Sequence, residues 1–323
     1  METFNYPLPP DRIAQVPVEP RSAARLLVST DPGGSVEHRR VADLPDLLRA
    51  GDLLVLNETR VLPARLRLQK SSGGQVEVLV LRVDAEGCGV ALVRPGRRVA
   101  AGTVLFDGPV PVAEVGEAGP DGERAVRLLA PLEAHGEVPL PPYIEEPLAD
   151  PERYQTVYAA RPGSVAAPTA GLHLTYDVLD RLTTAGVRVA TIDLTVGLAT
   201  FQPITADRVE DHRMHLEHYA VPDATMAAIA SADRVVAVGT TTVRALESAA
   251  RGARAGTTDL FIRAPFDFKV VDLLLTNFHM PRSSLLVLLH AFYGDGWREL
   301  YDGALRDGYR FLSFGDAMLV SKQ

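Results

Sequence analysis

From residue 176 to the C-terminus, short apolar runs alternate with segments of helical spacing, and this alternation restricts the possible fold more than any other feature. The runs VRVATIDL, RVVAVG and VDLLL have the length and apolar content of buried strands. Helical patterns separate them, among them YDVLDRLTTAG, DATMAAIASA, TTTVRALESAA and SLLVLLHAFYG. Strand, loop and helix in repeated succession favour a parallel sheet covered by helices. The run GDLLVLNETRV near the N-terminus predicts a further buried strand.

The segment from about residue 70 to about residue 135 has a different character. The β-like runs GGQVEVLVLRV, GVALVRP, GTVLFDG and RAVRLLA are separated by Gly, Pro and Asp. Close spacing with turn signals predicts a small antiparallel barrel or sandwich. We therefore expect an α/β fold, with a mixed α/β main domain formed from both ends of the chain, residues 1–68 and 145–323, and an inserted β-barrel-like domain at 69–144.

Composition limits the classes of protein to which the chain can belong. The chain has 323 residues, a formal net charge of −8 and a single cysteine, Cys88. No apolar run approaches the length of a membrane span, and METFNYPLPPDR lacks the basic and apolar regions of a signal peptide. We expect a cytoplasmic monomer that contacts no membrane.

The acidic balance does not suggest a nucleic-acid binder, although a local basic face would suffice for one. Two clusters could supply such a face: Arg60, Arg65, Arg67 and Lys70 in one segment, and Arg94, Arg97 and Arg98 around RPGRR. A solvated charged strand and turn is the simpler interpretation of both clusters.

Four polar loops follow predicted strands, at residues 57–60, 195–200, 239–242 and 276–279. In open α/β sheets ligands bind beyond the carboxyl ends of the strands. The loop GTTTVR leads directly into a helix, whose free N-terminal amides favour an anion, and Arg244 adds a cation. Plain N-capping by threonine explains the same residues, and Glu247 could pair with Arg244 in either case.

The loop TNFHMPRSS places an aromatic ring and an imidazole side by side. Phe278 could stack on a purine and His279 could transfer a proton near neutral pH, or both could be packing residues. His212, His215 and Glu217 resemble a zinc-ligand spacing, but no cysteine pair or third cluster accompanies them, so we expect no metal. Walker, GxSxG and GxGxxG motifs are absent from the sequence.

Taken together, the segments resemble one family, the S-adenosylmethionine:tRNA ribosyltransferase-isomerases of queuosine biosynthesis. The resemblance covers nearly the whole chain. The segments that carry it are FNYPLPPDRIAQVPVEPR, GDLLVLNETRVLPARL, GGQVEVLVL, PLPPYI, RYQTVYA, GSVAAPTAGLHLT, HRMHLE, VGTTTVRALES, TDLFI, TNFHMPRSSLL and YRFLSFGDAML. Each segment alone is a weak signal, and their common order is specific.

The resemblance implies a reaction. The family moves the ribosyl part of S-adenosylmethionine onto the aminomethyl group of a 7-deazaguanine base at the tRNA wobble position. Adenine and methionine leave, and epoxyqueuosine forms. The resemblance implies tRNA as partner and no metal or redox cofactor, since S-adenosylmethionine is consumed as a substrate.

This chemistry requires a base near the sulfonium, assistance for the departing adenine and a site for the methionine carboxylate. By resemblance, the expected catalytic residues are His173, His279 and His215. The expected substrate contacts are Asn57, Thr59, Arg60, Pro168, Thr169, Ala170, Gly171, Thr195, Gly197, Thr200, Phe201, Gly239, Thr240, Thr241, Arg244, Asn277 and Phe278. Small residues in GSVAAPTAGLHLT would form a pocket wall close to a flat purine or sugar.

The chain departs from the family pattern at several positions. Where the family reads LHVGxGTF, this sequence has Thr195 for the histidine and Ala199 for the second glycine. Threonine cannot serve as a general base near neutral pH. A diverged paralogue that uses a small-molecule acceptor or none is therefore one alternative, and a non-catalytic RNA-binding protein is another. The retained His173 and His279 argue against the non-catalytic alternative.

Overall fold

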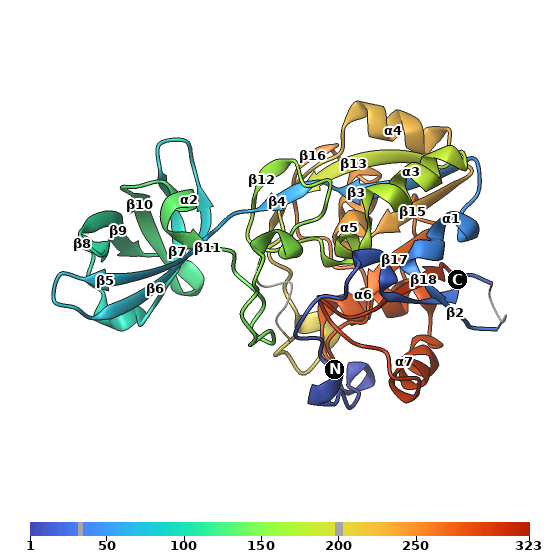
Figure 1. The fold of residues 1–323 in the computed structure, drawn as a ribbon, viewed down its shortest axis with the longest axis horizontal. Helices are drawn as coiled ribbons and strands as arrows, with labels where there is room; N and C mark the ends of the chain where they lie inside the picture. Colours follow the sequence, from blue (N-terminus) through green and yellow to red (C-terminus); the bar gives the residue numbers. More distant parts are fainter. Residues whose placement is uncertain (32–34, 198–202) are drawn as a thin grey trace. The chain divides into compact units, whose positions relative to one another are not determined.

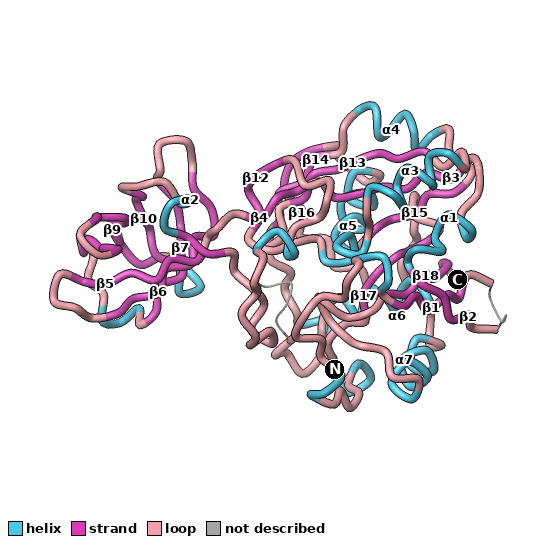
Figure 2. Tube along the Cα trace, in the orientation of Figure 1, coloured by secondary structure: helices cyan, strands magenta, loops and turns pink. Residues whose placement is uncertain are grey.

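The computed structural model describes residues 1–31, 35–197 and 203–323, and it divides into two compact units (Figures 1 and 2). The main unit comprises Met1–Thr59, Pro141–Arg161 and Ala167–Gln323. The barrel unit comprises Arg60–Leu140 and Pro162–Ala166.

A nine-stranded sheet forms the centre of the main unit, in the order β16-β14-β13-β3-β15-β17-β18-β1-β2. Its strands are β1 (Arg25–Ser29), β2 (Glu37–Arg40), β3 (Asp52–Asn57), β13 (Arg188–Leu194), β14 (Glu217–Ala220), β15 (Arg234–Val238), β16 (Ala255–Thr258), β17 (Leu273–Asn277) and β18 (Ala317–Ser321). The neighbours β13, β3, β15 and β17 are parallel, so their carboxyl ends lie at one edge of the sheet. At the far edge, β2 is antiparallel to β1 and all four of its residues are exposed.

Helices cover both faces of this sheet. On one face lie α1 (Leu44–Leu47) and α3 (Tyr176–Thr184), whose apolar side chains share a core with alternate strand residues, namely Leu54, Leu56, Val236, Val238, Leu273 and Leu275. Helix α5 (Thr240–Ala249) contacts the same strands without joining that core, so it lies on the opposite face. Helix α4 (Asp223–Ala230) contacts β13, α6 (Ser284–Tyr293) contacts β18, and α7 (Trp297–Arg306) contacts α6. Among the described helices, none has the length and apolar character needed to cross a bilayer.

Helix α3 begins and ends where local chemistry predicts. The Thr175 hydroxyl accepts a hydrogen bond from the Val178 amide at 3.2 Å and caps the first turn. Gly186 has a φ of 85° and donates its amide to the Thr183 carbonyl at 3.0 Å, which ends the helix. A capping hydroxyl at Thr175 and a left-handed glycine at Gly186 thus set the two ends of the helix.

The barrel unit is built on one antiparallel sheet in the order β11-β5-β6-β7-β10-β9-β8, in which β8 also pairs with β5 and closes the barrel. Its strands are β5 (Arg65–Lys70), β6 (Gln75–Val83), β7 (Cys88–Arg94), β8 (Thr103–Asp107), β9 (Val110–Ala118), β10 (Glu123–Leu128) and β11 (Gly136–Glu137). A short helix, α2 (Leu132–His135), precedes β11, and β4 (Thr59–Val61) and β12 (Arg161–Ser164) form a separate two-stranded sheet. The α/β class with an inserted β-barrel is confirmed.

Candidate active site

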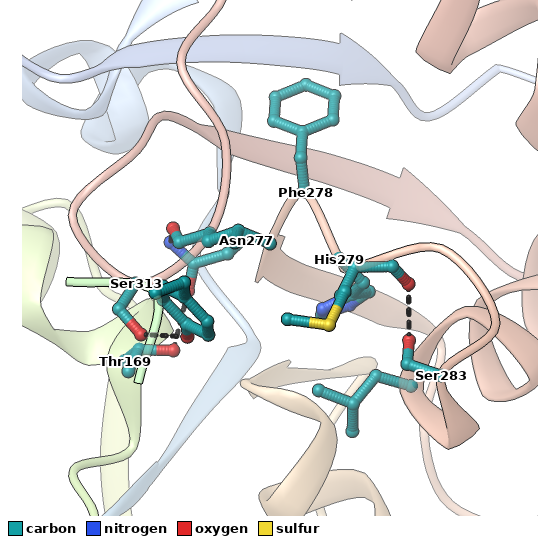
Figure 3. Close-up of a pocket in the computed structure, with 10 residues that line it drawn as sticks. Thr169, Asn277, Phe278, His279, Ser283 and Ser313 are labelled. Atoms are coloured by element: carbon teal, nitrogen blue, oxygen red, sulfur yellow. Dashed lines mark hydrogen bonds between the residues drawn. The ribbon is translucent and has the colours of Figure 1, made fainter. Parts of the chain in front are cut away.

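Two cavities lie in the main unit at the edge where the parallel strands end. The first, which we call the threonine cavity, is lined by residues 167–170, Val196, residues 239–241, Thr276, Asn277, His279 and Leu285. The second, the adjoining cavity, is lined by Tyr143, Thr169, Asn277, Phe278, His279, Met280, Ser283, Leu285, Leu312 and Ser313 (Figure 3). The loops after β13, β15 and β17 and the segment before α3 thus meet at one place.

Small side chains form the wall before α3. Ala167, Pro168, Thr169 and Ala170 all line the threonine cavity, and a 3-10 helix (Thr169–His173) follows. Gly171, an expected substrate contact, lines neither cavity, and a Cβ there would collide with the Tyr158 hydroxyl.

The N-terminus of α5 opens onto the threonine cavity. Gly239 precedes it with a φ of 88°, and no side chain of the described residues caps the helix. The Thr242 hydroxyl donates to the Val238 carbonyl at 2.7 Å, so it is used inside the helix. The Thr241 hydroxyl is buried and has no hydrogen-bond partner among the described residues. Unsatisfied first-turn amides and a partial positive charge therefore face the cavity.

Asn277 connects the cavity wall to His173. Its Nδ2 donates to the Leu312 carbonyl at 3.2 Å and to His173 Nε2 at 3.1 Å, while its Oδ1 accepts the Thr169 hydroxyl at 2.9 Å. A carbonyl oxygen can only accept, so Leu312 fixes which end of the amide is nitrogen. His173 Nε2 therefore accepts, and the neutral ring carries its proton on Nδ1.

Both loop histidines are buried and uncharged at neutral pH. Burial, and then the nearby Arg310, Arg21 and Arg153, lower the pKa of His173 to about 4. Burial alone lowers the pKa of His279 to about 3. His279 lines both cavities and lies 3.1 Å from the Thr276 hydroxyl, whereas His173 borders a smaller cavity with Arg21 and Arg153.

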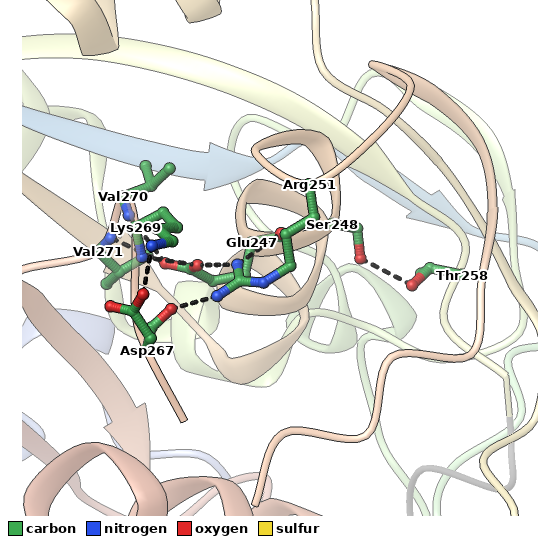
Figure 4. Close-up of polar contacts among 8 residues, drawn as sticks. All are labelled: Glu247, Ser248, Arg251, Thr258, Asp267, Lys269, Val270 and Val271. Atoms are coloured by element: carbon green, nitrogen blue, oxygen red, sulfur yellow. Dashed lines mark hydrogen bonds and ion pairs between the residues drawn. The ribbon is translucent and has the colours of Figure 1, made fainter. Parts of the chain in front are cut away.

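Arg244 does not reach the cavities. Its guanidinium is buried in an ion pair with Glu217 and donates to the Leu260 carbonyl at 3.1 Å, which ties α5 to β14. The anticipated pairing with Glu247 is wrong. Glu247 instead binds Arg251 at 2.5 Å and accepts the backbone amides of residues 269–271 at 2.9, 3.0 and 3.2 Å (Figure 4). Arg244 is thus a structural cation and not the expected ligand contact.

The ring of Phe278 points away from Thr169 and His279 (Figure 3). It is fully buried among Tyr301, Tyr309 and Phe311, at centroid distances of 5.4, 5.5 and 4.8 Å. A ring enclosed in this way offers no face to a nucleobase. The expected stacking role of Phe278 is therefore corrected to core packing.

Several other expected contacts lie away from the two cavities. Asn57 is buried and joins the ends of β3 and β13, because its Oδ1 accepts the Leu194 amide at 3.1 Å and its Nδ2 donates to the Leu194 carbonyl at 3.0 Å. The lining of neither cavity includes Thr59, Arg60, Thr195 or Gly197, and Arg60 belongs to the barrel unit. Thr200 and Phe201, with Ala199, lie outside the described residues.

His215 is exposed and borders an open hollow with Pro203, Thr205, Ala206, Asp211, His212 and Arg213. The structure places it neither with His279 in the two cavities nor with His173 in the smaller cavity beside Arg21 and Arg153. His212 packs edge-to-face on Phe261 at 5.3 Å. In the described part of the chain, no group of three or more His, Cys, Asp or Glu residues could hold a metal ion.

Sequence reasoning missed one wall of the adjoining cavity. Tyr143 and Ser313 line it, and their hydroxyls lie 2.7 Å apart. They belong to the segments PLPPYI and YRFLSFGDAML, which resemble the family but had been given no role. The sequence signal for these two residues was that they lie in family-like segments. A local pattern cannot show that residues 170 positions apart are in contact.

The structure is that of an α/β protein with two adjacent cavities at the carboxyl edge of its parallel strands. A family model described as queuosine biosynthesis protein matches residues 1–320. The chain therefore belongs to the queuosine biosynthesis protein family.

Named relatives agree with this assignment. An S-adenosylmethionine:tRNA ribosyltransferase-isomerase of Thermus thermophilus is 51% identical over 343 residues, covering 99% of both chains. One of Moorella thermoacetica is 49% identical over 339 residues, again with 99% of both chains covered. A crystal structure of the S-adenosylmethionine tRNA ribosyltransferase of Thermotoga maritima superposes with a TM-score of 0.57 at 37% identity, covering 98% of this chain and 99% of that one.

Proposed function

We propose that this protein is an enzyme that transfers and isomerises the ribosyl moiety of S-adenosylmethionine onto the aminomethyl group of 7-aminomethyl-7-deazaguanine at the tRNA wobble position. Adenine and methionine leave, and epoxyqueuosine forms on the tRNA. The observation that carries the proposal is identity of about half the residues, over nearly the whole of both chains, to relatives named for this activity.

The reaction balances without an external oxidant or reductant. The amine nitrogen gains a carbon substituent and loses a proton, while the ribosyl carbon skeleton gives up adenine and methionine. S-adenosylmethionine thus acts as a substrate, and we propose no further cofactor.

His279 is the proposed base for the proton on the carbon beside the sulfonium. Its side chain lines both cavities, and the neutral ring keeps one unprotonated nitrogen. His173 is the proposed positioning partner, because its Nε2 is occupied by Asn277. Thr169, Ala170, Pro168, Gly239, Thr240, Thr241 and Asn277 form the proposed substrate walls.

The test measures adenine release from S-adenosylmethionine with no acceptor, with the free deazaguanine base, and with tRNA that carries the aminomethyl base. Release only with the tRNA supports the proposal. Release without tRNA would instead establish a paralogue with a small-molecule acceptor or none, and tRNA binding without release would establish a non-catalytic RNA-binding protein. We also propose that the protein is cytoplasmic and that its active species is a monomer. Light scattering under turnover conditions measures the molar mass and so tests the monomer.

A matched pair of variants tests the base. His279→Gln should abolish adenine release while tRNA binding persists, because the amide keeps a hydrogen-bonding side chain without a basic nitrogen. His215→Gln removes an exposed imidazole outside both cavities and serves as the comparison. Near-normal release by His279→Gln would remove it from the catalytic role.

A further inference from the structure

One wall of the threonine cavity offers hydrogen-bond donors that have no acceptor among the described residues. The first-turn amides of α5 have no intrahelical acceptor, and no acidic or capping side chain of the described residues occupies the helix end. The Thr241 hydroxyl lines the same wall, is only 6% exposed and has no partner among the described residues. Buried polar groups are normally paired, so this wall is arranged for an anionic acceptor.

The facing wall offers the opposite polarity. The Leu312 carbonyl fixes the orientation of the Asn277 amide, so Asn277 Oδ1 takes the single proton of the Thr169 hydroxyl. Thr169 has then no proton left to give to a ligand and presents lone pairs alone. A group bound against Thr169 must therefore be a hydrogen-bond donor.

The two walls belong to one cavity, since Thr169 and Thr241 both line it. A Cβ built on Gly239 would lie 3.7 Å from the Ala170 Cβ and 3.7 Å from Thr241 Oγ1, so the segment that carries Thr169 and Ala170 lies beside the helix end. Between them the lining is aliphatic, from Ala167, Pro168, Ala170, Val196 and Leu285. Such a surface accommodates methylene groups.

We propose that the threonine cavity binds the α-amino-acid end of S-adenosylmethionine, with its carboxylate at the α5 N-terminus and Thr241 and its ammonium group at Thr169. This assignment rests on the proposed function for the identity of the ligand. The adjoining cavity, which shares Thr169, Asn277 and His279, then takes the nucleoside end. His279 lies at the junction of the two cavities, beside the sulfonium.

The experiment compares three ligands by calorimetry on the full chain. They are S-adenosylmethionine, its decarboxylated form, which keeps the amino group, and the sulfonium analogue with a 3-carboxypropyl chain, which keeps the carboxylate. Thr241→Val should weaken binding of S-adenosylmethionine by about 10- to 100-fold, the effect of losing a hydrogen bond to a charged group, and leave binding of the decarboxylated form unchanged. Thr241→Ser, which retains the hydroxyl, should bind like the natural chain.

Thr169→Val should show the complementary pattern. It should weaken binding of S-adenosylmethionine and leave the 3-carboxypropyl analogue unaffected, and Thr169→Ser should restore binding. A valine variant that weakens all three ligands equally would overturn the assignment, as would one that weakens none.

The outcome separates this inference from the proposed function. If the natural chain releases adenine with tRNA but Thr241→Val does not distinguish the ligands, only the amino-acid site is wrong. If the natural chain binds no S-adenosylmethionine, the proposed function fails and the site assignment fails with it. Thermal melting of each variant identifies a loss of fold. Where a valine variant has lost its fold, the ligand affinities of the corresponding serine variant decide the site assignment.

Discussion

Two buried imidazoles should make the fold sensitive to mild acid by an amount that can be worked out. The pKa values of His173 and His279 lie at about 4 and about 3 in the folded chain, below the ordinary value of 6.5. The unfolded chain therefore binds protons first as the pH falls. The stabilisation is complete above pH 6.5 and is lost progressively as the pH falls toward the folded pKa values.

Each ring contributes a similar share over the accessible range. Between about pH 7.5 and about pH 5 the linkage relation gives a loss of about 2 kcal/mol for each histidine, hence about 4 kcal/mol for both. Denaturant unfolding at a series of pH values measures this loss. His279→Gln should reduce the acid sensitivity by about 2 kcal/mol over the same interval, compared with His215→Gln at an exposed position. Equal pH dependence in the two variants would refute the reasoning that a buried neutral ring at residue 279 resists protonation.

Three further variants probe the neighbourhood. Asn277→Asp places a carboxylate against His173 and should raise the pKa of that ring by about 2–3 units, which an NMR titration measures; an unchanged pKa contradicts the hydrogen-bond assignment. Phe278→Ala should lower the free energy of unfolding by about 3–5 kcal/mol, with little change in ligand affinity for the folded fraction, whereas a stacking role predicts the reverse. Glu247→Ala removes the acceptor of the backbone amides of residues 269–271 and should lower the free energy of unfolding, measured with denaturant, by about 3 kcal/mol. Glu247→Gln should lower it less, because a carbonyl oxygen remains; equal losses would exclude a role for that oxygen.

The architecture of the main sheet was predictable because its determinants are local. Apolar periodicity, the cap at Thr175 and the terminating glycine at Gly186 each act within a few residues. The assembly of the loops after β15 and β17 followed from a general rule about parallel strands. These parts of the site need no knowledge of distant contacts.

The wrong predictions concern residues whose contacts are made with residues far away in the sequence. Arg244 has Glu247 one turn away on its own helix, yet it pairs with Glu217, which only sheet topology brings close. Phe278 looks available in a loop, but its ring is enclosed by residues more than twenty positions further along the chain.

The outer strand β2 has a consequence for the behaviour of the chain in concentrated solution. Its residues Glu37, His38, Arg39 and Arg40 are all exposed, and three are charged. Docking of another copy along this strand would require the hydration of these charged side chains to be shed. The apolar β1 beneath it is already paired on both sides, with β18 and β2. A short polar strand thus covers one edge of a strongly apolar sheet and disfavours its growth by addition of further strands.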